Sequence, residues 1–256
     1  SQSHLEKALD LGVIDEFDLD FKSAVKKADL IVIATPVGAI KSVLEEIKDS
    51  IPENAVITDV GSTKGNVLEA ATAVFGELPS RFIPAHPIAG NEKSGVIASF
   101  IKLFNGRRVI ITPQLHSDLK AVEKIKSLWM ACGAEVVVTS VEHHDTILAA
   151  TSHLPHVLAF SLVNTLSAMD DKNDIFKFAA GGFDDFTRIA SSNPQMWSDI
   201  CIANKDALID VLDKFTNDLA DLKQAINSQD AIELKKQFSR AKKIRDSVKK
   251  VFPVAY

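Results

Sequence analysis

Short apolar runs, separated by polar stretches of helical spacing, occupy the first half of the chain. The runs of strand length cover residues 30–34, 55–58, 82–84, 109–111 and 136–138. Most of their residues are β-branched, and apolar and polar positions do not alternate within them. This is typical of parallel strands that helices cover on both faces. The pattern therefore predicts an α/β domain with a parallel sheet over residues 1–140.

The pattern changes after Ser140, where the strand-like runs stop. Apolar residues recur every three or four positions over 208–226 and over 234–248, which predicts two amphipathic helices. Asn193 followed by Pro194 predicts another helix start, because asparagine caps helices and proline is favoured at their first position. Residues 141–256 are therefore expected to form an all-helical domain.

The stretch 142–169 is apolar on most sides of its predicted helix. A helix that is apolar all round is buried, either in the middle of a bundle or against a second subunit. Because few residues remain to wrap around it, we expect this helix to lie at a shared dimer interface.

Composition places the chain among ordinary globular proteins, since 46% of its 256 residues are hydrophobic and 25% are charged. The net charge of -5 gives no field that attracts nucleic acid or an anionic membrane. We interpret the basic residues of 235–250 as the solvated face of the last helix. No apolar run approaches the roughly 18 residues that span a bilayer, and a signal-peptide pattern is absent. Two cysteines suit a reducing compartment, so we expect a cytoplasmic protein.

Polar residues follow the ends of the first two predicted strands. Thr35 and Pro36 come after the first strand, and Ser62 and Lys64 come after the second. The carboxyl ends of parallel strands line the ligand crevice of an open α/β sheet, so these residues can lie along a dinucleotide. The competing interpretations are an ordinary strand-to-helix turn that Pro36 opens, and a plain helix cap by Ser62 or Thr63.

The third predicted strand leads into His86, which is followed by Pro87. Pro87 biases the backbone of His86 toward an extended conformation. A histidine held there can accept the proton of a substrate hydroxyl near neutral pH. A lone histidine is more often structural, but three successive strand ends with polar groups at one crevice favour catalysis.

A histidine pair interrupts the apolar helix of the second half. Pro155 should kink this helix and free backbone carbonyls near Thr151. His153 and His156 are three residues apart and share a face. Two ligands without an acidic or cysteine cluster do not make a metal site, so we expect substrate hydrogen bonds or helix packing.

Arg188 lies in an otherwise apolar stretch and is therefore expected to be part-buried. A buried guanidinium needs a bidentate carboxylate. That carboxylate could come from Asp184 or Asp185, or from a substrate acid.

Four motifs, in this order, resemble the prephenate/arogenate dehydrogenase family of tyrosine biosynthesis. They are Thr-Asp-Val-Gly-Ser-Thr-Lys at 58–64, His-Pro-Ile-Ala-Gly at 86–90, Ser-His-Leu-Pro-His at 152–156 and Gly-Gly-Phe-Asp-Asp-Phe-Thr-Arg-Ile-Ala at 181–190. The resemblance covers nearly the whole chain. It implies a dinucleotide-binding (Rossmann-like) α/β domain over 1–140, followed by an all-α dimerisation domain over 141–256 that forms a homodimer. It also implies oxidative decarboxylation of prephenate to 4-hydroxyphenylpyruvate, or of arogenate to tyrosine, with NAD or NADP.

The resemblance also implies a role for each matching residue. His86 would accept the proton of the ring hydroxyl, and Ser62 would orient His86 and the nicotinamide. Arg188 would hold a substrate carboxylate. The other substrate-binding residues would be Ser152, His153, His156 and Glu92. The cofactor-binding residues would be Thr35, Pro36, Ser62 and Lys64.

Two other interpretations compete with this one. A 3-hydroxyacid or imine-type reductase shares the two domains and the Ala-Thr-Pro turn, but it does not explain the two histidine motifs. A non-catalytic module that senses a dinucleotide or other ligand would not need His86, Ser62 and Arg188 together. Within the dehydrogenase interpretation, the acid at Asp184 could favour the amino group of arogenate over the keto group of prephenate.

No Gly-x-Gly-x-x-Gly motif follows a strand in this sequence. The first strand of a doubly wound fold normally carries that motif, and the second carries the residue that selects NAD or NADP. We therefore expect the dinucleotide-binding domain to be N-terminally incomplete, with an upstream βαβ unit of about 30 residues.

Overall fold

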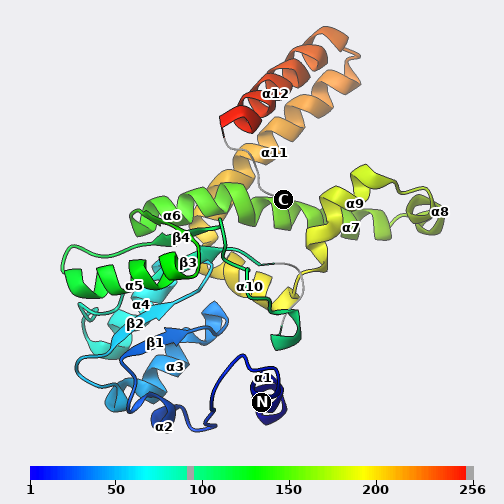
Figure 1. Ribbon diagram of the computed structural model, residues 1–256. Coiled ribbons are helices and arrows are strands. Elements are labelled where there is room, and N and C mark those ends of the chain that lie inside the picture. Colours follow the sequence, from blue (N-terminus) through cyan, green and yellow to red (C-terminus); the bar gives the residue numbers. More distant parts are fainter. Residues whose placement is uncertain (91–94, 252–256) are drawn as a thin grey trace. The chain divides into compact units, whose positions relative to one another are not determined.

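Figure 1 shows the computed structural model, which describes residues 1–90 and 95–251. The chain divides into two compact units, Ser1–Leu208 and Ile209–Tyr256. Residues 141–208 of the predicted helical domain thus belong to the same unit as the α/β part.

The first unit contains five strands in two hydrogen-bonded groups among its described residues. These strands are β1 (Leu30–Ile33), β2 (Val56–Asp59), β3 (Ala85–Ile88), β4 (Arg108–Ile111) and β5 (Glu135–Val138). The β1–β2 and β4–β5 pairs are parallel, whereas the β3–β4 pair is antiparallel. A single parallel bridge between Ile57 and Phe82 joins the two groups.

The expectation of a wholly parallel sheet with a strand at 82–84 is therefore wrong. That segment contributes the bridge at Phe82, and the regular strand begins three residues later at Ala85. An apolar run that is buried on both faces has the same pattern in either direction, so the sequence could not show that β3 and β4 run antiparallel.

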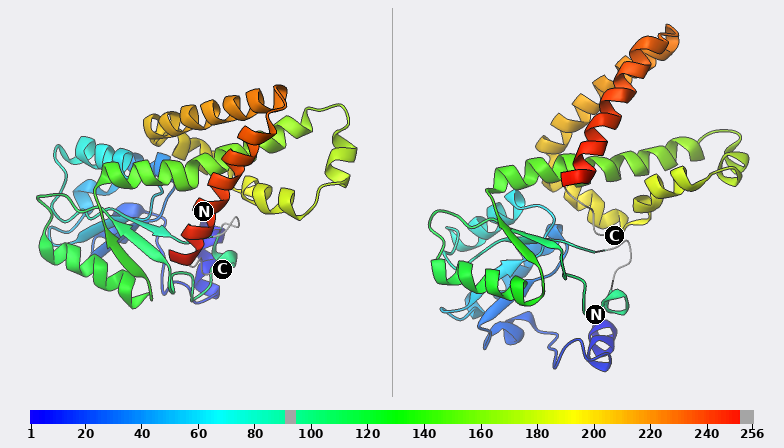
Figure 2. Two further views of the ribbon diagram at one scale, coloured as in Figure 1. Left: turned by 90° about the horizontal axis from the view of Figure 1, so that it is seen from above. Right: turned by 45° about the horizontal axis from the view of Figure 1, so that its top comes forward.

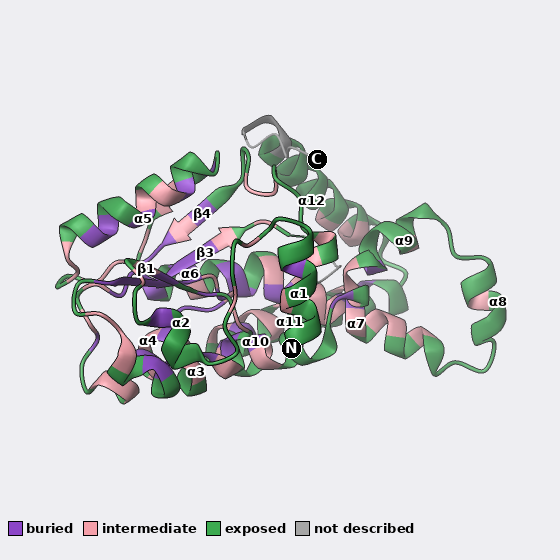
Figure 3. Cartoon of the chain, turned by 60° about the horizontal axis from the view of Figure 1, so that its bottom comes forward, coloured by how far each residue is buried: buried purple, intermediate pink, exposed green. Residues whose placement is uncertain are grey.

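Helices cover both faces of the strands. In Figure 3 many strand residues have the colour of buried residues, and the strands lie between helices that are partly exposed. Val56 and Ile57 of β2 belong to different core clusters, because neighbouring strand residues point to opposite faces. The cluster around Ile57 packs against α3 (Ile40–Ile47), α4 (Gly65–Phe75) and α10 (Pro194–Ala203). The cluster around Val56 packs against α5 (Leu119–Ala131).

One continuous helical rod, visible in Figure 2, runs from α6 (Val141–Leu148) through the π-helical turn η4 (Ala149–His153) into α7 (Leu154–Ser167). Pro155 lacks the N–H that would donate to the carbonyl of Thr151, so the regular hydrogen-bond ladder is interrupted at this point. The predicted interruption is present, and it takes the form of a widened turn.

The rod is long and apolar enough to cross a membrane by length and composition alone, with a mean hydropathy of 1.4 over 18 residues. A core helix of a globular domain meets the same criterion. His144 and His153 of this rod are buried and hydrogen-bonded to other side chains of the first unit. Those contacts favour an internal helix.

The N-terminus of α10 follows the predicted cap, since Asn193 accepts a hydrogen bond from the backbone N–H of Met196 at 3.0 Å. Trp197 and Ile200 of α10 are buried in the cluster that contains Val37, just beyond β1. The shorter helices of this unit are α1 (Gln2–Asp10), α2 (Phe21–Val25), α8 (Lys172–Lys177) and α9 (Gly181–Thr187), together with the short turns η1 (Val37–Ala39), η2 (Lys48–Ser50), η3 (Val96–Ala98) and η5 (Arg188–Ser191).

The second unit consists of the two helices predicted from spacing. These are α11 (Lys205–Asn227), which begins within the first unit, and α12 (Ala231–Val251). Leu222, Phe238 and Ile244 line a groove between them. The described basic side chains of α12, such as Lys235 and Lys243, are exposed, in agreement with a solvated face.

Candidate active site

His86 lies in β3 next to a buried ion pair that joins β3 to β2. The side chain of His86 is buried, with 8% of the residue exposed. Asp59 Oδ1 accepts from the backbone N–H of Ala85 at 3.2 Å, and Lys64 Nζ donates to the Ala85 carbonyl at 2.7 Å. These two side chains take the place of backbone ladder bonds between β2 and β3, and so they fix the backbone immediately before His86.

Lys64 and Asp59 also pair directly with each other, and both are fully buried. Burial lowers the pKa of the Lys64 ammonium, and the carboxylate of Asp59 opposes that shift. The predicted cofactor-binding role of Lys64 would require its amine at the open end of the sheet. In the structure this amine faces Asp59 and the Ala85 carbonyl, where it holds two strands together.

Gly61 makes room for this arrangement. Its backbone N–H donates to Asp59 Oδ2 at 2.8 Å. A Cβ atom on residue 61 would lie 2.8 Å from Val37 Cγ1 and 2.9 Å from Asp59 Oδ2, closer than real Cβ contacts come. A larger residue here would therefore displace either the core or the ion pair.

A chain of hydrogen bonds runs from His86 to a carboxylate on α6. His86 Nδ1 lies 2.9 Å from His144 Nε2, and His144 Nδ1 lies 2.7 Å from Asp145 Oδ1. Asp145 also accepts from the backbone N–H groups of Lys64 at 2.9 Å and Gly65 at 2.8 Å, at the start of α4. Three segments that are distant in sequence thus meet at His86.

Burial lowers the pKa of His86 well below 6.5, and the nearby positive charge of Lys64 lowers it further. His86 is therefore neutral at neutral pH and can accept a proton. Burial tends to raise the pKa of Asp145, but the hydrogen bonds from His144, Gly65 and Lys64 outweigh it and the net pKa is lowered.

Ser62 follows β2 and is half-buried. The family resemblance implies that Ser62 orients His86, but no hydrogen bond joins the two within residues 1–90 and 95–251. The Nδ1 atom of His86 contacts His144 instead.

Thr35 and Pro36 follow β1, which is the neighbour of β2 in the sheet. Thr35 Oγ1 is buried and has no hydrogen-bond partner in the described part of the chain. A buried hydroxyl without a partner is costly, so a ligand that reaches it would be favoured. Because Thr35 and Ser62 follow adjacent parallel strands, they fit a dinucleotide laid across these strand ends.

The rings of His153 and His156 both pack against the indole of Trp197. The ring of His156 stacks on Trp197 with centroids 3.6 Å apart, and His153 meets it edge-on at 6.1 Å. His156 Nδ1–H donates to the carbonyl of Ser152 at 2.9 Å, which leaves Nε2 as a hydrogen-bond acceptor. Burial lowers the pKa of His156, and the charge of Arg188 lowers it further.

Burial lowers the pKa of His153 to about 4, so its imidazole is neutral. The amide nitrogen of Asn204 lies 3.2 Å from His153 Nδ1 and donates 2.8 Å to the backbone carbonyl of Asp145. The carbonyl can only accept, which fixes the amide orientation and makes His153 Nδ1 an acceptor. His153 Nε2 therefore carries the proton. It is buried and has no partner among the described residues, so it is a donor available to a ligand.

Arg188 begins η5 and is exposed. The expectation that it would be part-buried is wrong, because the turn after α9 lies at the surface. Its charge nevertheless lowers the pKa of His156, after the larger effect of burial. Ser152 is half-buried in η4, and Glu92 lies outside the described residues.

Sequence reasoning missed four residues of this site. They are Asp59, His144, Asp145 and Trp197. The adjacent His144 and Asp145 are the only signal that could have been used, because a histidine beside a carboxylate is a common catalytic pairing. Nothing in the sequence linked them to His86.

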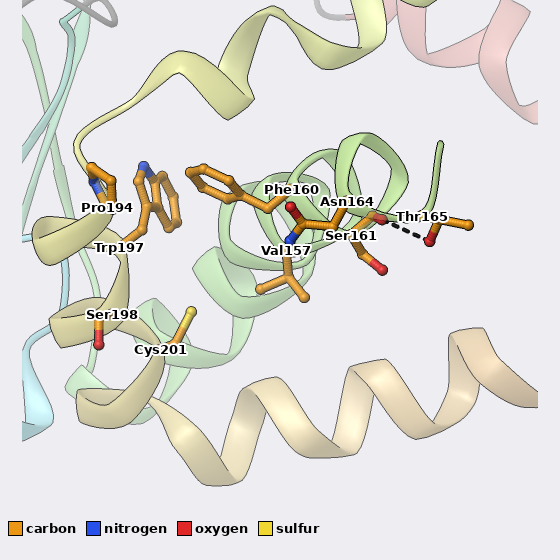
Figure 4. A pocket seen from close by; sticks show the side chains of 9 residues that line it. All are labelled: Val157, Phe160, Ser161, Asn164, Thr165, Pro194, Trp197, Ser198 and Cys201. Carbon is orange, nitrogen blue, oxygen red and sulfur yellow. Dashed lines mark hydrogen bonds between the residues drawn. The ribbon is translucent and has the colours of Figure 1, made fainter. Parts of the chain in front are cut away.

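A groove of about 510 Å³, which shares Trp197 with the site, lies between α7 and α10 (Figure 4). Its lining is mainly apolar and includes none of the predicted site residues. The lining residues are Val157, Phe160, Ser161, Asn164, Thr165, Pro194, Trp197, Ser198 and Cys201.

Comparison with known proteins gives consistent matches. The family models for "Prephenate dehydrogenase, nucleotide-binding domain" and "Prephenate dehydrogenase, dimerization domain" match residues 1–138 and 140–240. A cyclohexadienyl dehydrogenase of Zymomonas mobilis is 39% identical over 95% of this chain and 82% of its own length. A prephenate dehydrogenase of Bacillus subtilis is 42% identical over 94% of this chain, which spans 65% of that relative. The crystal structure of prephenate dehydrogenase from A. aeolicus, in complex with hydroxyphenyl propionate and NAD+, has a TM-score of 0.89 at 36% identity, covering 97% of this chain and 86% of that one.

Proposed function

The chain belongs to the prephenate dehydrogenase family, and from this premise we propose that it catalyses the NAD(P)-dependent oxidative decarboxylation of prephenate or arogenate in tyrosine biosynthesis. The predicted family and fold class, a Rossmann-like nucleotide-binding domain followed by an all-helical dimerisation domain, are confirmed. The two competing interpretations, a different reductase or a non-catalytic module, are not favoured by these matches.

His86 is the proton acceptor in this proposal. The substrate ring carries a hydroxyl on the carbon that loses a hydride, and the hydroxyl proton moves to His86 as carbonyl character develops. Loss of the ring carboxylate as carbon dioxide leaves its bonding electrons in the ring, which becomes aromatic. The proton then returns from His86 to the ring oxygen as the phenol forms. Positioning and a neutral base are what this chemistry requires of the protein.

Thr35, Pro36 and Ser62 would hold the dinucleotide across the ends of β1 and β2. When bound there, the dinucleotide accepts the hydride. The unpartnered hydroxyl of Thr35 supports this placement, and the buried Lys64 would keep the adjoining strands in register.

The substrate would lie between His86 and the histidine pair. Arg188 would bind a substrate carboxylate, because a guanidinium can form two parallel hydrogen bonds with it. His153 Nε2–H would donate a further hydrogen bond, and Ser152 and His156 would line the same pocket. Glu92 would help to govern access to this pocket and its electrostatics, as the family resemblance implies.

The observation that carries this proposal is the neutral, buried His86 in a domain that also holds two buried polar atoms without a partner among the described residues, Thr35 Oγ1 and His153 Nε2. The test is an assay of NAD(P)H formation with prephenate and arogenate, each with NAD and NADP. We expect turnover in at least one combination and a loss of roughly 10²-fold or more in His86→Asn. Absence of turnover in all four combinations would contradict the proposed reaction.

We propose a cytoplasmic homodimer assembled through the helical domain. The support is the match to a dimerisation domain and the apolar groove on α7 and α10, which a second copy would cover. Sedimentation equilibrium of Phe160→Asp against the parent protein tests this assignment. The variant should shift toward monomer, and an unchanged dimer would place the interface elsewhere.

A further inference from the structure

We propose that His144 and Asp145 are positioning residues that fix the tautomer and orientation of His86, so that its Nε2 lone pair faces the substrate hydroxyl. This inference rests on the proposed function for its catalytic consequence. The hydrogen-bond chain itself is a property of the fold.

The direction of each hydrogen bond in this chain follows from the carboxylate at one end of it. The Asp145 carboxylate only accepts hydrogen bonds, so the 2.7 Å contact requires a proton on His144 Nδ1. In the proposed chain this is the single proton of the His144 ring, so its Nε2 accepts, and the 2.9 Å contact to this atom requires a proton on His86 Nδ1. By exclusion, the neutral ring of His86 carries its lone pair on Nε2.

Hydrogen bonds fix the position of Asp145 and so keep this arrangement in place. Its two carboxylate oxygens accept three hydrogen bonds, one from His144 and two from backbone N–H groups at the start of α4. The helix N-terminus adds a partial positive charge that favours the ionised carboxylate. Its own backbone carbonyl is fixed by Asn204. Gly65 permits this close approach, since a Cβ there would lie 3.1 Å from Asp145 Oδ2.

The surroundings of His86 make such a fixed partner necessary. Burial disfavours the protonated form of His86 most strongly, and the positive charge of Lys64 disfavours it further; His144 and His153 are the other titratable groups near it. A transient imidazolium at His86 is therefore poorly tolerated unless a negative charge opposes it. Asp145, connected through His144, supplies that charge without taking up a proton itself.

The proton steps balance without transfer along the chain. The proton that His86 Nε2 takes from the ring hydroxyl is the one that it returns to the ring oxygen. The protons on His86 Nδ1 and His144 Nδ1 remain in place throughout. His144 and Asp145 therefore act only by orientation and electrostatics.

Asp145→Ala tests the tautomer assignment, because it removes the acceptor of His144 Nδ1–H. His144 can then carry its proton on Nε2 and donate it to His86 Nδ1, which leaves the proton of His86 on Nε2. We expect kcat to fall by about 10²- to 10⁴-fold, with KM for the dinucleotide within about twofold of the parent. Asp145→Glu should recover part of kcat.

The matched control is His143→Asn. His143 precedes His144 on the same helix but is exposed and outside the hydrogen-bond chain, so kcat and KM should not change. The direct readout is ¹⁵N NMR of histidine-labelled protein, with resonances assigned by single substitutions. In the parent protein at neutral pH, His86 and His144 should both carry their proton on Nδ1, the less common form of free histidine. Both should switch to Nε2 in Asp145→Ala.

The two proposals fail in different ways. If the parent protein shows His86 protonated on Nε2, or if Asp145→Ala keeps full kcat while His86→Asn is inactive, the positioning role is overturned. If the parent protein turns over neither substrate but its NMR spectrum shows both Nδ1 protons, the reaction assignment fails and the hydrogen-bond chain stands.

Discussion

Replacing Lys64 by methionine removes the ammonium of a fully buried ion pair while keeping most of the side-chain volume. The carboxylate of Asp59 would then stay buried with two backbone donors, the N–H groups of Gly61 and Ala85. The Ala85 carbonyl would lose its contact with Lys64. Breaking a buried pair from one side costs about 3–5 kcal/mol, because an uncompensated charge remains. We expect the free energy of unfolding to fall by that amount.

Urea unfolding of Lys64→Met and the parent at the same protein concentration measures this loss. Lys41→Met is the control, since Lys41 and Glu45 form an exposed pair at 4.0 Å whose loss should cost less than about 1 kcal/mol. The double variant Asp59→Asn, Lys64→Met should be more stable than additivity predicts, because it leaves no unpaired charge. A loss below about 1 kcal/mol for Lys64→Met would refute the reasoning that this pair is what joins β2 to β3.

Three further predictions follow from the site. The pKa of His153 is about 6.5 in the unfolded chain and about 4 in the folded chain, so protonation favours the unfolded chain. The free energy of unfolding should therefore fall by up to about 3 kcal/mol as the pH drops from 6.5 to about 4. Urea titrations at several pH values should show a shallower fall in His153→Gln, and an unchanged slope would contradict the shift. Gly61→Ala should lower stability by about 1–3 kcal/mol through its clash with Val37, measurable by thermal unfolding, with exposed Gly76→Asn as a variant that avoids any core clash. Arg188→Gln should raise KM for the substrate by about 10- to 100-fold and leave KM for the dinucleotide unchanged; steady-state kinetics with an unchanged substrate KM would remove Arg188 from the pocket.

Local patterns predicted much of the helical architecture. The spacing of apolar residues over 208–226 and 234–248 corresponds to α11 and α12, and Asn193 caps α10 as expected. These features depend on residues within one or two helical turns of each other. Their physical causes, periodicity and capping, are therefore contained in short segments of sequence.

Strand direction and the exposure of Arg188 depended on packing instead. The apolar pattern of the segment around 82–88 does not show the direction of a strand that is buried on both faces. Only its pairing with β4 shows that β3 runs antiparallel. Arg188 was expected inside because its neighbours are apolar. It lies outside because the turn that follows α9 is at the surface of the first unit.

The sequence by itself determined the chemistry that is available. A histidine before a proline, a histidine pair on one helix and an arginine, in motifs that follow one another in this order, were enough to identify the family by resemblance. Only the tertiary structure decided how His86 is held. Its partner His144 is 58 residues away, and the carboxylate beyond it is fixed by the start of α4, some 80 residues earlier in the chain. Hydrogen bonds between such distant residues form because helices and strands pack around a shared core, and no local pattern records which side chains that packing brings within 3 Å.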